Sequence, residues 1–409
     1  MKSVFILGRQ PALGKAELES LFGATALQPI GTNAIACDLN FNEIPFSRLG
    51  GCIKLAKILT WLDTTSWDEI EYYLAKAIPD HLHYLPPGGK LKLGISAYDL
   101  DVNPKLINAT GFAVKKIIKN SGRSVRIIPN KFTALTSAQV IHNQLTDKLG
   151  WELLLIKDGK RTLLAQTTSE QDIEAYAARD QARPMRDARV GMLPPKLAQI
   201  IINLANPPVG SEVLDPFCGT GVILQEAMLM GYSVCGSDID PRMGEYSRAN
   251  LDWLVSKFPK LDKLNRSWQL GDATQMKWET SGFTINDSIV KSAKRMPNSI
   301  QCIACETYLG RPFSSTPKPH VLDEVIQDVN SILKKFLQNV ARQTSTGIRM
   351  CIAVPAWRVE HGFKHLKVLD SLEELGYNRI RFKHVNSDDL IYHRNGQVVG
   401  RELMVLERI

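Results

Sequence analysis

The sequence lacks any long apolar run. None of its 409 residues belongs to a stretch approaching the roughly 18 to 20 apolar residues that a membrane helix needs. The opening segment MKSVFILGRQ is too short, and becomes polar too soon, for a signal peptide. We therefore expect a cytoplasmic protein with no membrane partner.

Cysteine is too sparse and too scattered for a disulfide framework. The seven cysteines are odd in number, which is typical of reduced thiols in a reducing compartment. Cys302 and Cys305 form a CxxC pair, but a structural zinc would need a second ligand pair. The apolar run SIQCIACE around them predicts a buried strand instead. We expect core thiols and no bound metal.

Acidic residues are absent between Asp101 and Asp147, and that stretch carries several basic ones. The whole chain has a net charge of +8. Clustered cations release counterions from a nucleic-acid backbone and so add affinity, whereas a solvated basic face is the structural alternative. We predict an RNA-binding surface formed by Lys115, Lys116, Lys119, Arg123, Arg126 and Lys131.

Changes in pattern divide the chain, which has no internal repeat. The predicted parts are an α+β module over 1–62, an α+β unit over 63–168 that holds the basic stretch, a polar linker over 169–185, and a domain over 186–409. Within the second part, Thr136 is the predicted N-cap of a helix. We therefore expect two small modules before a larger C-terminal domain.

Residues from about 186 onward alternate apolar strands with helices, as in a parallel α/β sheet. The predicted helices include 194–205 and 363–376. Near the end, two apolar strands flank the Asn395–Gly396 pair, which is a strong hairpin signal. The predicted fold class is α/β, a Rossmann-like domain with a C-terminal antiparallel hairpin, preceded by an α+β half. Such a hairpin favours a methyltransferase over an all-parallel dehydrogenase.

The run VLDPFCGTG, residues 213–221, lies between a predicted strand and a predicted helix, where a Rossmann-type sheet binds its nucleotide-bearing ligand. The acid at the strand end would repel a pyrophosphate. It would attract a cation such as the α-amino group of S-adenosylmethionine. We predict that this cofactor is bound by Asp215, Pro216, Cys218, Gly219 and Gly221.

Acids also end the next two predicted strands. Asp238 ends SVCGSD, where a carboxylate can accept hydrogen bonds from both ribose hydroxyls. Asp272 follows SWQLG, where a carboxylate or the neighbouring backbone can meet the adenine amino group. Either acid alone could be a helix cap or a surface charge. Together with Asp215 they predict one cofactor site at the carboxyl ends of successive strands.

Several runs resemble the THUMP-domain RNA methyltransferases, in the branch that makes N2-methylguanosine at position 10 of tRNA. The resemblance covers nearly the whole chain and is carried by residues 136–145, 171–205, 215–231, 236–243 and 394–406. It implies a class I methyltransferase domain that uses S-adenosylmethionine, preceded by a ferredoxin-like module and a THUMP domain that grips the tRNA acceptor end. It leaves open whether a small activating subunit is needed, as in eukaryotic relatives.

One motif departs from this family. At the end of the fourth strand the relatives carry Asp-Pro-Pro-Tyr or Asn-Pro-Pro-Tyr, whereas this chain has CETYLG over residues 305–310. A guanine amine needs an acceptor for its N–H groups while charge develops on nitrogen. We predict Glu306 as that acceptor and Tyr308 as the aromatic ring stacked on the base. The alternative is that both merely line the strand end.

The leading hypothesis is therefore a methyltransferase that transfers a methyl group from S-adenosylmethionine to the exocyclic N2 of a tRNA guanosine, at position 10 by the resemblance. A noncatalytic protein that binds the cofactor and RNA is the second hypothesis. A methyltransferase for another nucleotide is the third, since Cys305 would serve as the thiolate nucleophile for a pyrimidine carbon. A DNA amino-methyltransferase is the fourth. The sequence leaves mono- or dimethylation and oligomeric state open.

Overall fold

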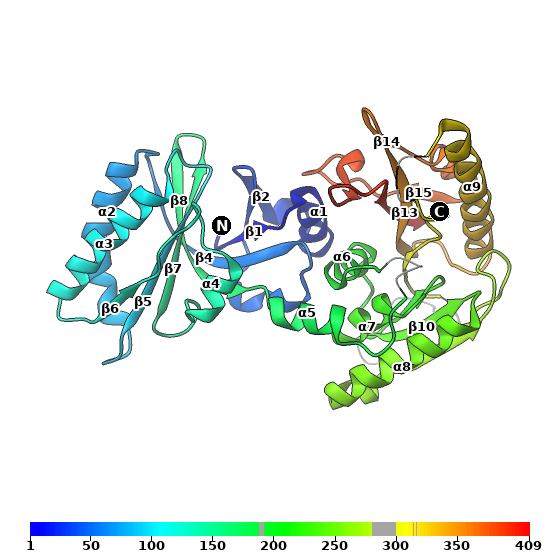
Figure 1. Cartoon of the computed structure of the whole chain (residues 1–409), viewed down its shortest axis with the longest axis horizontal. Helices are drawn as coiled ribbons and strands as arrows, with labels where there is room; N and C mark the ends of the chain where they lie inside the picture. The colour runs from blue at the N-terminus through cyan, green and yellow to red at the C-terminus, as the bar shows by residue number, and fades with distance from the viewer. Residues whose placement is uncertain (188–191, 280–299, 314, 316) are drawn as a thin grey trace. The chain divides into compact units, whose positions relative to one another are not determined.

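The computed structural model describes residues 1–187, 192–279, 300–313, 315 and 317–409. The chain forms two compact units (Figure 1). The first comprises residues 1–15, 22–47 and 51–174, and the second comprises residues 16–21, 48–50 and 175–409. No helix of the described residues is long and apolar enough to span a membrane.

The first unit contains an eight-stranded sheet in the order β2-β3-β1-β4-β8-β7-β5-β6. Only β5 pairs in parallel, with β6 and with β7; the other described strand pairs of this sheet are antiparallel. The strands are β1 (Ser3–Leu7), β2 (Leu27–Ile30), β3 (Ala34–Cys37), β4 (Cys52–Leu62), β5 (Leu91–Tyr98), β6 (Val125–Ile127), β7 (Gly150–Asp158) and β8 (Arg161–Glu170). The helices of residues 1–170 are α1 (Pro11–Phe22), α2 (Trp67–His81), α3 (Pro104–Asn120) and α4 (Ser137–His142).

The two modules expected over 1–62 and 63–168 share this sheet, because β4 pairs with β8. The boundary between them remains a prediction. Helices α2 and α3 lie side by side against the β5–β8 part of the sheet (Figure 1). Their apolar faces bury Ile70, Leu74 and Val114 against strand residues such as Leu93 and Leu155. Burial of these faces fixes α3, and with it most of the basic stretch, on the outside of the sheet.

The second unit contains a nine-stranded sheet whose main path runs β11-β10-β9-β12-β13-β17-β15. Pairs from β11 to β13 are parallel, whereas β17 runs antiparallel to both β13 and β15. The strands are β9 (Glu212–Asp215), β10 (Ser233–Asp238), β11 (Arg266–Leu270), β12 (Ile303–Glu306), β13 (Arg349–Val359), β14 (Gly362–Lys364), β15 (Tyr377–Arg379), β16 (Ile391–Tyr392) and β17 (Val399–Arg408). The helices from residue 173 onward are α5 (Ile173–Gln181), α6 (Pro195–Ala205), α7 (Val222–Leu229), α8 (Pro241–Lys257) and α9 (Pro319–Ala341).

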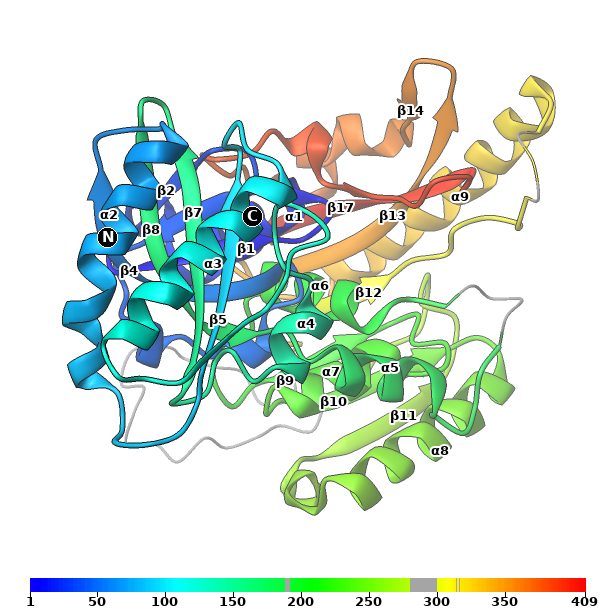
Figure 2. The ribbon, with the colours of Figure 1, turned by 60° about the vertical axis from the view of Figure 1, so that its left-hand side comes forward.

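Helices cover both faces of this sheet (Figure 1). Figure 2 shows α9 lying along the β13–β17 part, where its apolar face buries Val329, Leu333 and Phe336. The helix α6 packs against β12 and β13 and begins with Pro195, whose fixed φ suits a first helical position. It ends at Ala205 and is followed by the C-cap residue Asn206, which has left-handed geometry (φ 46°). The Rossmann-like fold with a C-terminal antiparallel hairpin is therefore confirmed, since β16 pairs with β17 across the Asn395–Gly396 turn.

The helix predicted over 363–376 is wrong. Strand β14 pairs there with β13, and the following residues form two short 3₁₀ helices, Lys367–Ser371 and Glu373–Leu375. The leucines of this segment recur at every third position, although the buried Val368 does not follow this spacing, and the spacing matches the 3.0 residues per turn of a 3₁₀ helix rather than the 3.6 of an α-helix. These leucines are Leu366, Leu369, Leu372 and Leu375. The three-residue spacing of the leucines was therefore wrongly interpreted as the period of an α-helix.

Candidate functional site

The carboxyl ends of four parallel strands bring the predicted site acids to one edge of the second sheet. Strand β9 ends at Asp215, β10 at Asp238 and β12 at Glu306, and Asp272 lies two residues beyond β11. Strands β9 and β12 are neighbours in the sheet although β10 and β11 intervene in the chain. The β9–β12 boundary is thus the topological switch point, where open α/β sheets bind their ligands.

The loop between β9 and α7 is held close to the sheet edge by its own backbone. The Cys218 N–H donates to the Ser237 carbonyl at 2.9 Å, and the Phe217 N–H donates to Asp215 Oδ1 at 3.2 Å. Gly219 and Gly221 adopt positive φ angles of 49° and 82°. A Cβ on Gly221 would lie 2.6 Å from the Ser247 Oγ. Both glycines are therefore required by the path of the loop.

Asp238 is fixed by two backbone donors. Its Oδ2 accepts from the Gly219 N–H and its Oδ1 from the Asp240 N–H, each at 3.0 Å. Burial raises the pKa of Asp238, and the two donors oppose this shift. Asp240 is the N-cap of α8, with its side chain accepting from the Arg242 N–H at 2.9 Å. The Asp238 carboxylate therefore ties the glycine loop that follows β9 to the end of the neighbouring strand β10.

Asp215 is the most buried of these acids. Desolvation raises its pKa well above the usual range, and the charges of Asp238 and Glu306 raise it further. Its predicted companions Pro216 and Cys218 are buried too. The Pro216 carbonyl accepts from the Ser237 Oγ at 3.2 Å, so these two residues shape the loop. The concentrated negative charge favours a ligand that places a cation beside Asp215.

Asp272 is a turn residue in this arrangement. Its Oδ1 accepts from the Thr274 N–H at 2.8 Å, and its neighbour Gly271 donates its N–H to the Asp238 carbonyl at 3.0 Å. The turn therefore lies next to the end of β10. A contact between Asp272 and an adenine remains a prediction.

Glu306 makes an ion pair that the sequence reasoning missed. Its Oε1 accepts from the Nε–H of Arg401 on β17. Burial raises the pKa of Glu306, and the guanidinium opposes this. Tyr308, two residues on, is 46% exposed and therefore accessible to a ligand. The sequence signal that could have identified Arg401 is its position next to the apolar run of β17. A charged residue that is buried in a strand is almost always paired, so a carboxylate partner could have been sought.

The buried thiols do not support nucleophilic chemistry. Cys305 is fully buried, and desolvation raises its pKa well above the ordinary value, with Asp215 adding to the effect. Burial likewise raises the pKa of Cys302 to about 12. All seven cysteines are buried and free, so the expected core thiols are confirmed. Among the described residues no group of three potential ligands for a metal ion occurs.

A second candidate surface lies on α3 in the first unit. Phe112 is 59% exposed and shares one side of the helix with three of the predicted basic residues, which follow it at the spacings i+3, i+4 and i+7. These are Lys115, Lys116 and Lys119. The Lys115 ammonium lies 5.9 Å from the Phe112 ring centroid. The stripe therefore combines cations with an accessible ring.

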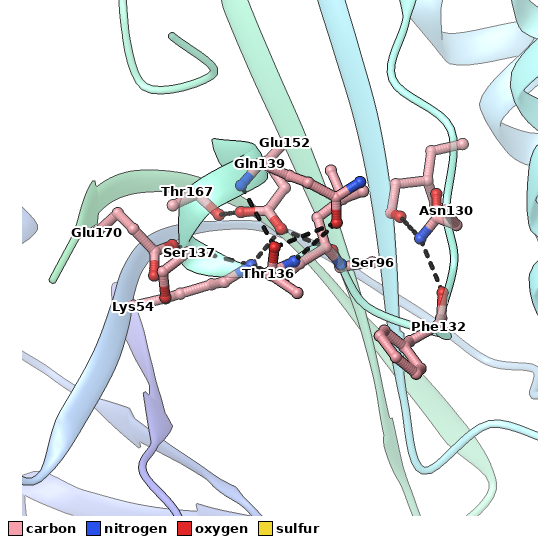
Figure 3. Close-up of polar contacts among 12 residues, drawn as sticks. Lys54, Ser96, Asn130, Phe132, Thr136, Ser137, Gln139, Glu152, Thr167 and Glu170 are labelled. Carbon is pink, nitrogen blue, oxygen red and sulfur yellow. Dashed lines mark hydrogen bonds and ion pairs between the residues drawn. The ribbon is translucent and has the colours of Figure 1, made fainter. Parts of the chain in front are cut away.

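The loop that carries Lys131 begins beside this stripe. Asn108, one turn before Phe112, donates to the Asn130 carbonyl at 3.0 Å and accepts from the Asn130 N–H at 2.7 Å. The Asn130 side chain in turn donates to the Ile95 carbonyl at 2.9 Å and to the Phe132 carbonyl at 3.2 Å. Figure 3 shows Asn130 aimed along the loop toward Phe132. The loop is therefore anchored while Phe132 remains 65% exposed.

The remaining predicted RNA-binding residues are less uniform. Arg126 on β6 and Lys131 are exposed. Arg123 donates from one terminal nitrogen to the carbonyls of Pro86 and Gly88, at 2.8 and 2.9 Å, so it braces a loop. Sequence reasoning missed Phe112 and Phe132, because exposure of an aromatic ring depends on tertiary packing rather than on local pattern.

Comparison with known proteins gives one family match and several relatives. Residues 183–302 match the RMKL-like methyltransferase domain family, although residues 188–191 and 280–299 of that range lie outside the described residues. A tRNA (guanine(10)-N2)-dimethyltransferase of Methanothermobacter thermautotrophicus is 51% identical over 74 residues, which is 18% of this chain and 22% of the relative. The same-named protein of Methanocaldococcus jannaschii is 44% identical over 80 residues, 19% of this chain and 23% of the relative. The matches thus span less than a quarter of these relatives.

Solved structures show the fold alone. TrmN from Thermus thermophilus superposes with a TM-score of 0.52 at 16% identity and covers 100% of both chains. A possible methylase from Clostridium difficile 630 gives a TM-score of 0.51 at 13% identity, covering 98% of this chain and 97% of its own. The second unit has the class I methyltransferase fold.

Proposed function

We propose that this protein is an S-adenosylmethionine-dependent methyltransferase that modifies the exocyclic N2 of a guanosine in tRNA, at position 10. The observation that carries the proposal is the set of carboxylates at the β9–β12 switch point, with Glu306 beside the cofactor-type loop. Similarity to relatives named tRNA (guanine(10)-N2)-dimethyltransferase supports the choice of substrate. We propose a cytoplasmic location, which a tRNA substrate supports.

The loop and the strand ends suit this cofactor. Asp215 would hold the α-amino group, because a buried carboxylate with a raised pKa gains most from a cationic partner. Asp238 would accept from the ribose hydroxyls, and the turn at Asp272 would meet the adenine. No side chain of the described residues fills the space beside Gly219, where an ideal Cβ would meet none of their atoms within 4 Å. When bound, the cofactor supplies an electrophilic methyl group on a sulfonium.

Glu306 would act on the target amine directly. Its carboxylate accepts an N–H of N2, which orients the nitrogen lone pair toward the methyl group. Transfer of the methyl group from that sulfonium would form the N–CH₃ bond and leave the electron pair of the S–CH₃ bond on sulfur. The displaced proton passes from N2 to the Glu306 carboxylate and then to solvent. Tyr308 would stack on the flipped base.

RNA capture is assigned to the first unit, with residues 1–62 as a ferredoxin-like module and 63–168 as a THUMP domain. The basic side of α3 would neutralise phosphates, while Phe112 and Phe132 would stack on unpaired bases. This combination of cations and exposed rings suits single-stranded nucleotides better than a regular duplex.

The competing function is noncatalytic binding of cofactor and RNA, favoured only by the altered CETYLG motif. The decisive experiment is methyl transfer to unmodified tRNA transcripts, with mass-spectrometric mapping of the product, for wild type beside Glu306→Ala. We expect N2-methylguanosine at position 10 from wild type and none from the variant. Tight cofactor and tRNA binding without transfer would favour the noncatalytic function, and recovery of transfer on adding cell extract would identify a missing activating subunit.

A further inference from the structure

We propose that Arg401 is a positioning residue that holds Glu306 as an ionised, acceptor-only group, and that this pair selects guanine over adenine. The inference rests on the proposed function and adds a residue and a basis of specificity to it. It starts from an ion pair that joins two strands lying on either side of β13.

The geometry gives Arg401 one partner and leaves Glu306 half available. On β17, Arg401 lies opposite Pro355 of β13, and its side chain reaches Glu306 at the end of β12. The two side chains are 7% and 15% exposed. Arg401 Nε binds Oε1 of Glu306, whereas Oε2 accepts no hydrogen bond from the described residues. One carboxylate oxygen is therefore fixed and the other is free for a ligand.

The electrostatics make this pairing necessary for an ionised Glu306. Burial raises the pKa of Glu306, and the charged groups that face it are Asp215 at the end of β9 and Arg401 from β17, with the Cys305 thiol next to it on β12. Asp215 disfavours a second negative charge, so Arg401 is the group that opposes protonation. Without Arg401 the carboxyl would become a neutral acid, which carries an O–H donor.

The chemistry of the bases then gives the selectivity. The guanine edge presents two adjacent donors, N1–H and the N2 amine. The adenine edge presents an acceptor, N1, beside its N6 amine. An ionised carboxylate only accepts hydrogen bonds, so the free oxygen of Glu306 can accept from the guanine donors but faces the adenine N1 lone pair unfavourably. A neutral amide or acid offers a donor and loses this distinction.

The test compares full-length wild type with Arg401→Gln, Arg401→Lys and Glu306→Gln. Arg381→Gln is the matched control, since Arg381 is exposed and lies outside the pair. Single-turnover transfer is measured from pH 6 to 9 on transcripts carrying guanine or adenine at the mapped position. Because one pKa unit changes the ionised fraction about tenfold below the midpoint, Arg401→Gln should lose about tenfold or more at neutral pH and recover toward pH 9. Arg401→Lys should lie between it and wild type.

The base preference is the second readout. Glu306→Gln should reduce the guanine-to-adenine rate ratio by about 5-fold to 150-fold, the range that corresponds to about 1–3 kcal/mol for one buried hydrogen-bonding group left without its partner. An equal loss for Arg401→Gln at every pH would show a merely structural arginine and overturn the positioning role. An unchanged base ratio in Glu306→Gln would overturn the selectivity.

Failure of the proposed function can be separated from failure of this inference. Carbon-13 NMR of carboxyl-labelled glutamate follows the Glu306 titration without turnover, with Glu306→Gln used to assign the signal. We expect the midpoint to rise in Arg401→Gln and to stay unchanged in Arg381→Gln. If wild type methylates no tRNA, the selectivity falls with the proposed function. A midpoint that does not move would overturn the positioning role in either case.

Discussion

Lys54 is the buried cation of the first unit, and its removal gives the sharpest stability prediction. Its ammonium pairs with Glu152, lies 3.8 Å from Glu170 Oε2 and donates to the Leu135 carbonyl at 3.1 Å. Figure 3 shows these carboxylates converging on Lys54 from β7 and β8. The perturbation is Lys54→Met, which keeps the apolar stem and removes the charge.

The magnitude follows from what remains buried. Glu152 keeps its donors, the Ser96 hydroxyl at 2.6 Å and the Thr167 hydroxyl at 2.7 Å, but loses its counter-ion. Breaking one side of a buried ion pair costs about 3–5 kcal/mol, because a charge is left uncompensated. The double variant Lys54→Met/Glu152→Gln removes that charge and should recover at least half of the loss.

The pH dependence has a definite sign. Burial alone would lower the pKa of Lys54, but Glu152, with Tyr98 and Glu170, raises it above the ordinary value. A raised lysine pKa gives stability that is fully present below the unfolded pKa of about 10.4 and is lost only as pH rises through the folded value. Wild type should therefore show no trend from Lys54 between pH 6 and 9.

Hydrogen exchange followed by mass spectrometry measures the loss of stability locally, on peptides from β4, β7 and β8. A loss of about 3–5 kcal/mol corresponds to exchange faster by about two to four orders of magnitude. The matched control is Lys57→Met on the same strand, half-buried, with an expected cost of about 0.5 kcal/mol or less. Equal amide protection from hydrogen exchange in Lys54→Met and Lys57→Met would refute the reasoning. Lower amide protection in the double variant than in Lys54→Met would also refute it.

Four further predictions address the two candidate sites. Gly221→Ala should weaken cofactor binding at least about tenfold in calorimetry, because its Cβ would lie 2.6 Å from the Ser247 Oγ at a φ of 82°, while tRNA binding stays unchanged. Cofactor affinity should rise with pH as Asp215 ionises, and Asp215→Asn should remove this dependence of affinity on pH. The same pH dependence in the variant would contradict the assignment of Asp215 to the α-amino group of the cofactor. Phe132→Ala should lower tRNA affinity about 5-fold to 150-fold, from about 1–3 kcal/mol per stacked base, with the salt slope of binding unchanged. Lys116→Gln should instead reduce that slope by about 1, and an unchanged slope would remove Lys116 from the phosphate contacts.

Local signals made much of the catalytic unit predictable. A strand that ends in an acid, followed by a glycine turn and a helix, is a continuous stretch of chain, so the sequence identified Asp215, Gly219 and Gly221 together. Asp238 followed because parallel strands end at the same sheet edge. Whether these residues bind the cofactor remains a prediction that binding measurements must test.

Non-local pairing explains what the sequence could not provide. The contact between Arg401 and Glu306 depends on β17 entering the sheet next to β13, and 95 residues separate the two in the chain. The loop that carries the exposed ring of Phe132 is held to α3 where Asn108 binds the backbone of Asn130. Neither contact produces a periodic pattern in the sequence, because each depends on a single polar side chain and a partner that is distant in the chain.

On the proposed function, hydrogen bonds take the place of the missing prolines in the altered fourth motif. In the family that the chain resembles, two prolines stiffen the backbone after the acceptor. Here the Thr307 N–H and hydroxyl both donate to the Ala353 carbonyl, at 2.9 and 3.2 Å, and so tie the same stretch to β13. Gly310 turns the chain with a φ of 84°, where a Cβ would lie 2.7 Å from the Val325 side chain.

Glutamate is one methylene longer than aspartate, and Arg401 removes the freedom that this adds by binding one carboxylate oxygen. A segment that had merely lost its catalytic role would have no reason to keep the acceptor, its counter-ion and the backbone tether together. The CETYLG segment is therefore better explained as a rebuilt acceptor site than as a degenerate one. Transfer by wild type together with loss in Glu306→Ala would establish this, whereas full transfer by Glu306→Ala would place the acceptor elsewhere.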